Sequence, residues 1–368
     1  MSDNLKELSE AGVSIWLDDL SRERLQSGSL ATLIEGSHVV GVTTNPSIFS
    51  AAIKGSDLYS GDIARLSAEG SSVSQIVTEL TTDDVSQACD LFLPVFTSSD
   101  HVDGRVSIEV DPFLAHETEP TIKQGLELWE KINKPNLLIK VPATLEGLPA
   151  ITALTAAGVS VNVTLIFSVE RYEMVMKAYL DGLEQRAQAG DDLSEIHSVA
   201  SFFVSRIDTE IDKRLDAMDA DSPLRGKSAI ANAALAYRSY LELINGERWK
   251  TLAAKGAKLQ RPLWASTGVK DKAYDPTRYV VELVAPDCVN TMPEGTLNVV
   301  RESGVVRGDT ITSTFVEAEQ VFVDLGNAGV DFADVVDFLE KDGVKKFADA
   351  WQELLDNVAA KAAASQTH

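Results

Sequence analysis

Cysteine and histidine, two of the residues that most often hold zinc, are scarce in this sequence of 368 residues. The only cysteines are Cys89 and Cys288, which lie too far apart for a metal-binding motif, so we expect two reduced thiols. The histidines show no metal-ligand spacing either; they are His38, His101, His116, His197 and His368. The sequence therefore predicts no metal site.

The sequence also lacks a long hydrophobic run. Its first ten residues, MSDNLKELSE, are polar and contain no apolar segment of the kind that directs secretion. No later stretch approaches the roughly 20 apolar residues that a membrane-spanning helix requires. We therefore expect a cytoplasmic protein with no membrane partner. Hydrophobic residues still make up 44% of the chain, which is ample for a large core.

The sequence has fewer basic than acidic residues. The chain has 33 lysines and arginines against 56 acidic residues, which gives a formal net charge of −23. Such an acidic surface repels nucleic acid and anionic lipid, so we expect neither as a partner. An anionic substrate must then be held by a local group of basic residues.

A glycine-rich dinucleotide-binding fingerprint is missing, because WLDDLSRERL surrounds the end of the first expected strand. What the sequence does contain is short apolar, β-branched runs that alternate with longer helical patterns. The expected strands cover residues 13–19, 39–45, 106–111, 137–141, 159–166, 198–205, 262–266 and 288–292. Eight strands with intervening helices favour an α/β fold, a parallel (βα)8 TIM barrel, over a doubly wound open sheet.

Two segments extend this pattern. Residues from about 50 to 100 contain no convincing strand and predict a helical insertion after the second strand. Residues from about 312 to 360 predict helices that close the barrel and pack on it. No repeat of the solenoid type is present, so we expect residues 1–368 to form one domain.

A lysine interrupts the apolar stretch NLLIKVPATLEG at Lys140. The run is short, apolar and closed by Pro142, which is typical of a buried parallel strand. Buried lysines are rare and unfavourable unless the charge is paired or the amine has a use. Lys140 is therefore the first candidate for a functional residue.

Polar residues also interrupt the other expected strands, near the carboxyl end of each. They are Asp18, Asn45, Glu109, Asn162, Thr164, Ser201 and Ser266. Strand side chains alternate between faces, so Asp18 shares a face with Trp16, and Asn162 shares one with Thr164. If these faces point into the barrel, the polar side chains converge at its carboxyl-terminal mouth, where barrel active sites are built.

These residue types fit one chemistry. A lysine in a low-dielectric site has its charged form disfavoured, and its neutral amine can attack a carbonyl. One neighbouring carboxylate can move protons as the carbinolamine forms and dehydrates, and a second can take a hydroxyl proton as a carbon–carbon bond breaks. One lysine and two carboxylates are enough for Schiff-base aldol chemistry.

At this point the residues show a resemblance. The motifs WLDD, GVTTNPSIF, VSIEVD, IKVPAT, VNVTLIFS and SFFVSRID are similar, in order and separation, to those of the transaldolase family. The resemblance covers most of the chain and implies a class I aldolase-type barrel of the pentose phosphate pathway. Such an enzyme moves a dihydroxyacetone unit from a ketose phosphate to an aldose phosphate and needs neither metal nor organic cofactor.

The resemblance implies a role for each catalytic residue. Lys140 would form the Schiff base with C2 of fructose 6-phosphate or sedoheptulose 7-phosphate. Glu109 would move protons through a bound water, and Thr164 would help to position that water. Asp18 would accept the proton of the C4 hydroxyl during cleavage; the adjacent Asp19 has the wrong strand parity.

The remaining residues would bind substrate. Asn45, Asn162 and Ser201 would hydrogen-bond the dihydroxyacetone hydroxyls. Arg206, in SFFVSRID, fits the family's phosphate-binding arginine. A second arginine that many relatives carry after the seventh strand is absent from LWASTGVKDKAY, which retains Ser266 and offers Lys270 as the nearest cation. Lys270 would contact the phosphate there through a single ammonium charge, rather than through the two parallel hydrogen bonds that an arginine guanidinium can donate.

Each of these residues also has a purely structural interpretation. Lys140 could reach solvent from a strand end, and Glu109 could be its ion-pair partner. Asn45, followed by proline, could open a turn. Arg206 could be a charge on a helix surface, and Lys270 a solvated loop residue.

Two other functions stay open at this point. One is a fructose 6-phosphate aldolase, which uses the same lysine but releases dihydroxyacetone. The insertion, the long C-terminal segment and Glu109 favour the transferase. The other is a sugar-phosphate-binding protein without activity, since a fold alone does not fix function. For each of these functions, we expect small sugar phosphates as ligands. We also expect the protein to be a monomer or a homodimer.

Overall fold

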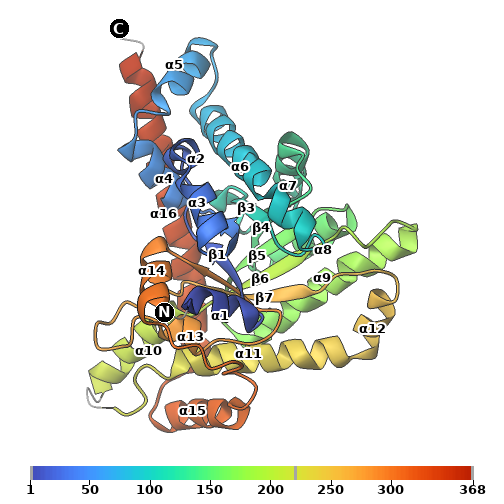
Figure 1. The fold of residues 1–368 in the computed structure, drawn as a ribbon, viewed down its shortest axis with the longest axis vertical. Coiled ribbons are helices and arrows are strands. Elements are labelled where there is room, and N and C mark those ends of the chain that lie inside the picture. The colour runs from blue at the N-terminus through green and yellow to red at the C-terminus, as the bar shows by residue number, and fades with distance from the viewer. Residues whose placement is uncertain (1–2, 219–221, 366–368) are drawn as a thin grey trace.

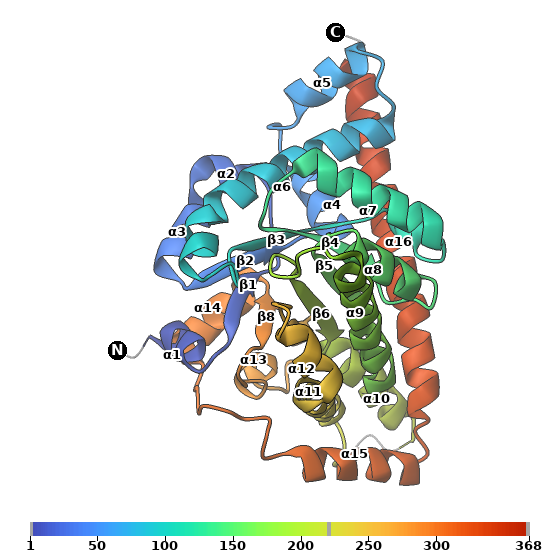
Figure 2. The same cartoon turned by 90° about the vertical axis from the view of Figure 1, so that its right-hand side faces the viewer.

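The computed structural model, which describes residues 3–218 and 222–365, has a closed barrel of parallel strands at its centre (Figures 1 and 2). The strands follow one another around the barrel in chain order and pair side by side. They are β1 (Ser14–Leu17), β2 (Val39–Thr43), β3 (Arg105–Glu109), β4 (Leu137–Pro142), β5 (Val161–Ile166), β6 (Ser198–Phe203), β7 (Gln260–Ala265) and β8 (Val289–Met292). Closure through β1 and β8 confirms the predicted (βα)8 barrel and rules out the open sheet.

The strands form where the sequence is apolar and β-branched, because both of their faces are buried. β4 and β5 are buried at every position. The register places Lys140 beside Glu109 of β3 on one side and beside Asn162 of β5 on the other. Three polar side chains of the predicted site therefore start from one level of the barrel.

Helices surround the barrel and follow most of the strands. They are α1 (Asn4–Glu10), α2 (Arg22–Ser27), α3 (Ser29–Gly36), α4 (Pro46–Gly55), α5 (Ser60–Ala68), α6 (Val73–Ser98), η1 (Pro112–Leu114), α7 (Thr118–Ile132), α8 (Gly147–Ala156), α9 (Val169–Ala189), α10 (Ser205–Met218), α11 (Ser228–Asn245), α12 (Glu247–Ala253), α13 (Arg278–Val281), α14 (Glu294–Ser303), α15 (Phe315–Asn327) and α16 (Phe332–Ser365). α4, α5 and α6 are the predicted insertion between β2 and β3.

α16 is the longest helix of the described residues, and it crosses the molecule rather than covering one strand. In Figure 2 it is drawn in red and runs from near α15 to a tip beside α5. It packs against α4, α5, α6 and α10. Its buried side follows the i, i+4 spacing of an amphipathic helix and contains Val335, Leu339, Gly343, Phe347, Trp351, Leu354, Val358 and Ala362. The predicted C-terminal helices thus form, and α16 links the barrel to the insertion.

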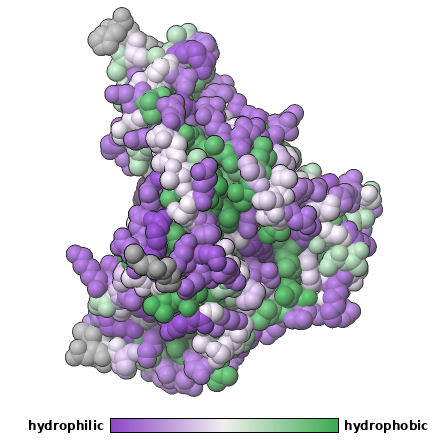
Figure 3. All heavy atoms as spheres, viewed as in Figure 1, coloured by the Kyte–Doolittle hydropathy of each residue, from purple (hydrophilic) through white to green (hydrophobic). Residues whose placement is uncertain are grey.

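The surface agrees with the acidic composition. Hydrophilic side chains cover most of the face in Figure 3, with smaller hydrophobic patches between them. Within residues 3–218 and 222–365, no helix is both long and apolar enough to cross a membrane.

Gly104 lies where the helical insertion connects to β3, and its conformation requires glycine. Gly104 lies just before β3 with φ +72, and an added Cβ would lie 2.7 Å from the carbonyl oxygen of Phe92 in α6. Because backbone atoms cannot move aside, we expect Gly104→Ala to lower the free energy of unfolding by about 3 kcal/mol. Gly70 has a similar φ of +85 but open space around it, so Gly70→Ala should cost only about 1 kcal/mol. Urea denaturation of both variants tests this, and equal losses would contradict it.

Candidate active site

Lys140 projects from β4 into the barrel mouth, and only 6% of its side chain is exposed. Its Nζ donates a hydrogen bond to the carbonyl oxygen of Thr44 at 2.6 Å and lies 3.3 Å from Oε2 of Glu109. The interpretation of Lys140 as a strand-end lysine that reaches solvent is therefore wrong. The interpretation of Glu109 as its ion-pair partner is correct as geometry, and it does not exclude a catalytic role.

Glu109 is as buried as its partner, with 6% of its side chain exposed. Burial raises the pKa of Glu109, the Lys140 ammonium opposes this, and the Asp18 carboxylate adds to it. A buried pair of this kind can exist as ammonium and carboxylate or as neutral amine and carboxylic acid. The second form contains the nucleophile and the proton donor that imine formation needs.

Asp18 follows β1 and accepts a hydrogen bond from Oγ1 of Thr43 at 2.8 Å. Burial raises the pKa of Asp18, while Lys140 and the Thr43 hydrogen bond lower it. Asp19 is held elsewhere, since its Oδ2 accepts a hydrogen bond from Nε of Arg24 at 2.7 Å. The parity argument that preferred Asp18 over Asp19 agrees with this geometry.

Lys140 and Asp18 open into a cavity of about 130 Å³ at the mouth of the barrel. Its lining comprises Asp18, Thr43, Asn45, Lys140, Thr164, Ser201, Phe203, Arg206, Ala265, Ser266, Gly268, Lys270, Thr291, Pro293 and Phe347. Eight of the ten residues expected at the site are among them. The other two, Glu109 and Asn162, lie beside Lys140 but do not line this cavity.

Similarity to known proteins agrees with the geometry. The family model described as transaldolase/fructose-6-phosphate aldolase matches residues 15–358. The chain belongs to this family. A protein named transaldolase from Mycobacterium tuberculosis (strain ATCC 25618 / H37Rv) is 57% identical over 360 residues, which cover 97% of this chain and 96% of that protein. Proteins with the same name from Mycolicibacterium smegmatis and Saccharopolyspora erythraea are each 57% identical over 355 residues, 96% of both chains.

In this member of the transaldolase/fructose-6-phosphate aldolase family, a hydrogen-bonded chain supports the site from below. Oγ of Ser201 donates to Oδ1 of Asn162 at 2.7 Å, and Nδ2 of Asn162 donates to Oγ of Ser107 at 3.0 Å. Asn162 has no exposed surface. Of Ser201, Asn162 and Ser107, only Ser201 lines the cavity, and the contact of Asn162 with a substrate stays a prediction.

Thr164 and Asn45 line the cavity in different ways. Thr164 is 1% exposed, and its Oγ1 is buried with no hydrogen-bond partner. A buried hydroxyl without a partner is unfavourable, so Oγ1 is available to a substrate or a water in the cavity. Asn45 is the N-cap of α4, where its Oδ1 accepts from the backbone N–H of Ile48 at 3.0 Å. Asn45 therefore opens a helix rather than a turn, and it also lines the cavity.

The cationic end of the cavity is formed by Arg206 at the start of α10. Its guanidinium lies 5.1 Å from the ring centroid of Phe203, and its Nη1 is buried without a hydrogen-bond partner. Burial lowers the pKa of Arg206. A buried guanidinium nitrogen without a hydrogen-bond partner fits an anion-binding group, and Arg206 is half-buried rather than fully exposed on the helix surface.

Ser266 and Lys270 complete this end. Oγ of Ser266 lies 2.9 Å from Oγ of Ser205, and Ser266 has φ +56, which is uncommon outside glycine and often occurs at functional sites. Lys270 is exposed at the rim of the cavity. The interpretation as a solvated loop residue fits its exposure, but its position at the rim keeps it within the candidate site.

Sequence reasoning missed the contribution of α16. Phe347 of α16 is 7% exposed; its ring centroid lies 5.9 Å from Nζ of Lys140 and 6.0 Å from Cζ of Arg206. One turn earlier, Gly343 approaches Leu165 and Nη1 of Arg206 so closely that an added Cβ would touch both. The apolar periodicity of α16 marked these positions as buried, but nothing in it indicated that they lie over the barrel mouth.

Among the residues that the structure describes, no group of three or more histidine, cysteine, aspartate or glutamate side chains is placed to hold a metal ion. His368 lies outside the described residues.

Proposed function

We propose that this chain acts as a transaldolase, which transfers a dihydroxyacetone unit between ketose and aldose phosphates through a Schiff base on Lys140. The observation that carries the proposal is the buried pair of Lys140 and Glu109 at 3.3 Å, facing Asp18 across the mouth of a parallel barrel. The family match and the full-length similarity to proteins named transaldolase support the transfer reaction.

In the first half of the reaction, Lys140 and Glu109 act together. The neutral amine of Lys140 attacks C2 of the ketose phosphate and gives a carbinolamine. Glu109 donates its proton to the departing hydroxyl, so the C2–O bond breaks and water leaves as the iminium forms. Thr164, whose Oγ1 is unpartnered, hydrogen-bonds this water.

The second half uses Asp18. Its carboxylate takes the proton of the C4 hydroxyl, the C3–C4 bond breaks, and the electron pair moves into the iminium to give an enamine. The aldehyde product leaves and an acceptor aldehyde takes its place. Asp18 then returns the proton to the new hydroxyl, and hydrolysis of the iminium frees Lys140. Phe347 covers the amine and limits the access of water to the enamine.

Transfer from fructose 6-phosphate to erythrose 4-phosphate tests this function. We expect sedoheptulose 7-phosphate and glyceraldehyde 3-phosphate as products, and little free dihydroxyacetone when the acceptor is omitted. Rapid turnover without an acceptor would indicate the aldolase instead. Absence of both reactions, together with tight binding of the sugar phosphate, would indicate a binding protein.

Arg206 and Lys270 are proposed to hold the phosphate. A buried charge-assisted hydrogen bond contributes about 1.5–3 kcal/mol, so Arg206→Gln should lower kcat/KM for fructose 6-phosphate about 100-fold, mainly through KM. Lys270 is exposed and screened by salt, so Lys270→Gln should lower kcat/KM only about fivefold. Steady-state kinetics at two salt concentrations measure both effects. A larger loss in Lys270→Gln would reverse the assignment.

Domain organisation, cellular location, oligomeric state and cofactor requirement complete the proposed function. We propose that residues 1–368 form one catalytic domain, that the protein is cytoplasmic and acts as a monomer or homodimer, and that it requires no metal or organic cofactor. A single hydrophobic cluster that includes side chains of β1 to β8, α4 to α6 and α16 supports the one-domain proposal. The net charge of −23 supports the proposal that nucleic acid is not a partner.

A further inference from the structure

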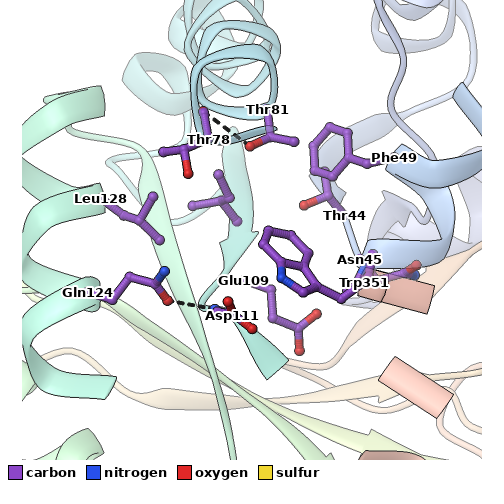
Figure 4. Close-up of a pocket in the computed structure, with 12 residues that line it drawn as sticks. Thr44, Asn45, Phe49, Thr78, Thr81, Glu109, Asp111, Gln124, Leu128 and Trp351 are labelled. Atoms are coloured by element: carbon purple, nitrogen blue, oxygen red, sulfur yellow. Dashed lines mark hydrogen bonds between the residues drawn. The ribbon is translucent and has the colours of Figure 1, made fainter. Parts of the chain in front are cut away.

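A second, smaller cavity lies against Glu109, apart from the substrate cavity (Figure 4). Its volume is about 20 Å³, which is enough for one water molecule. Glu109 and Asp111 from the β3 segment line one side of it, and side chains of α4, α6, α7 and α16 line the others. Glu109 and Asp111 are the two titratable residues of this lining.

Asp111 is held firmly beside this cavity. Its backbone N–H donates to Oε1 of Gln124 in α7 at 2.6 Å, and its Oδ1 accepts from the N–H of Phe113 at 2.9 Å. Burial raises the pKa of Asp111, and the Phe113 hydrogen bond and Trp351 lower it. The sequence motif VSIEVD thus contributes two carboxylates to one cavity, and the proposed mechanism uses only Glu109.

Trp351 of α16 closes the cavity from the opposite side. The residue is 9% exposed, and its buried Nε1 makes no hydrogen bond of normal geometry. In Figure 4 this nitrogen faces the carboxylate of Asp111. A buried indole N–H without a full partner is unfavourable, and a water in the cavity would satisfy it together with the two carboxyl groups.

We propose that Asp111, linked to Glu109 through a water in this cavity, is a positioning residue that keeps the proton of the Lys140–Glu109 pair on Glu109. The inference rests on the proposed Schiff-base function. Asp111 does not touch the substrate and exchanges no atom with it. It acts on the balance between the two forms of the buried pair.

The direction of the effect follows from charge. A negative Asp111 makes a second negative charge on Glu109 less favourable, so the shared proton stays on Glu109 and Lys140 stays neutral. This is the form that attacks the carbonyl and protonates the departing hydroxyl. Without the negative charge, the pair shifts toward ammonium and carboxylate, which can do neither.

The other groups that face the pair do not replace Asp111. Lys140 and Asp18 act on Glu109 from the substrate cavity, and both are engaged in the reaction itself. The side chains that α6 and α7 present to the small cavity are uncharged: Thr78, Thr81, Gln124 and Leu128. α4 contributes Pro46 and Phe49, which are uncharged too.

The test is the pH dependence of imine formation in Asp111→Asn. Asparagine retains the oxygen that caps Phe113 but removes the charge. The enzyme is mixed with fructose 6-phosphate, quenched with borohydride at successive times, and the adduct on Lys140 is quantified by mass analysis. Loss of a neighbouring negative charge lowers the pKa of Glu109, so we expect the pH profile to move about one unit toward lower pH. We also expect the maximal rate to fall about tenfold.

Glu117→Gln is the matched control, because Glu117 is exposed in the same loop and makes no side-chain cap. It removes the same charge and should leave the profile unchanged. Trp351→Phe removes the indole N–H but keeps a ring. It raises the pKa of Asp111, so imine formation should slow at acidic pH and recover at alkaline pH, where Asp111 is ionised in either protein.

The outcomes separate the two proposals. If the unmodified enzyme forms no adduct, the Schiff-base function itself fails. If it forms the adduct but Asp111→Asn has the same pH profile, or moves no more than Glu117→Gln, the role of Asp111 is refuted. A uniform loss of rate without a shift of the profile would show a purely structural role and would also refute it.

Discussion

Replacing Lys140 with methionine is expected to abolish transfer, with a loss of about 10⁶-fold, and to leave no adduct after borohydride reduction with fructose 6-phosphate. Methionine has a similar length and suits the buried position of Lys140, but it has no amine to form the carbinolamine. The measurement is intact-protein and peptide mass analysis after reduction, beside the transfer assay.

Lys123→Met is the control for this experiment, because Lys123 is a highly exposed lysine of α7 that does not line the cavity. It should give full activity and a normal adduct on the peptide that contains Lys140. Circular dichroism of Lys140→Met establishes that the barrel has folded. An adduct that persists in folded Lys140→Met would assign the nucleophile to another lysine, with Lys270 the first to test.

Asp18→Asn is expected to separate imine formation from bond cleavage. Loss of a general base costs about 10²–10⁴-fold in rate, so transfer should fall by that factor. The imine should still form, since Lys140 and Glu109 are intact. Borohydride should therefore trap a six-carbon adduct in Asp18→Asn, whereas the unmodified enzyme gives a three-carbon adduct after cleavage.

Asp19→Asn provides the matched comparison at the neighbouring position. Asp19 pairs with Arg24 and is 37% exposed, so its loss should cost no more than about 1 kcal/mol of stability and leave the three-carbon adduct unchanged. If Asp19→Asn trapped the six-carbon adduct and Asp18→Asn did not, the assignment of the base would be wrong.

Much of the site could be predicted because each strand has a strict two-residue alternation. Once the strands end at one mouth, parity alone separates Asp18 from Asp19 and puts Asn162 on the same face as Thr164. Burial on both faces makes the strands easy to recognise as apolar runs. The closed barrel and the positions of Asp18, Lys140 and Thr164 are confirmed for that reason.

The parts that could not be predicted depend on contacts between distant segments. The carbonyl of Thr44 that receives the Lys140 hydrogen bond belongs to the backbone, and sequence patterns do not reveal which carbonyl a side chain will meet. Phe347 and Trp351 come from a helix about 200 residues after β4, and helical periodicity gives a buried face without its partner. Asn162 does not line the cavity, and sequence patterns did not reveal its hydrogen bonds to Ser107 and Ser201.

The position of α16 also has a consequence for how the enzyme matures. Translation delivers all eight strands, and with them Lys140, Glu109 and Asp18, before the residues that cover the mouth. A nascent chain that has emerged only as far as β8 lacks Phe347, so nothing from α16 covers Lys140 at that stage. Phe347, which lies over Lys140, is therefore added to the site late in synthesis.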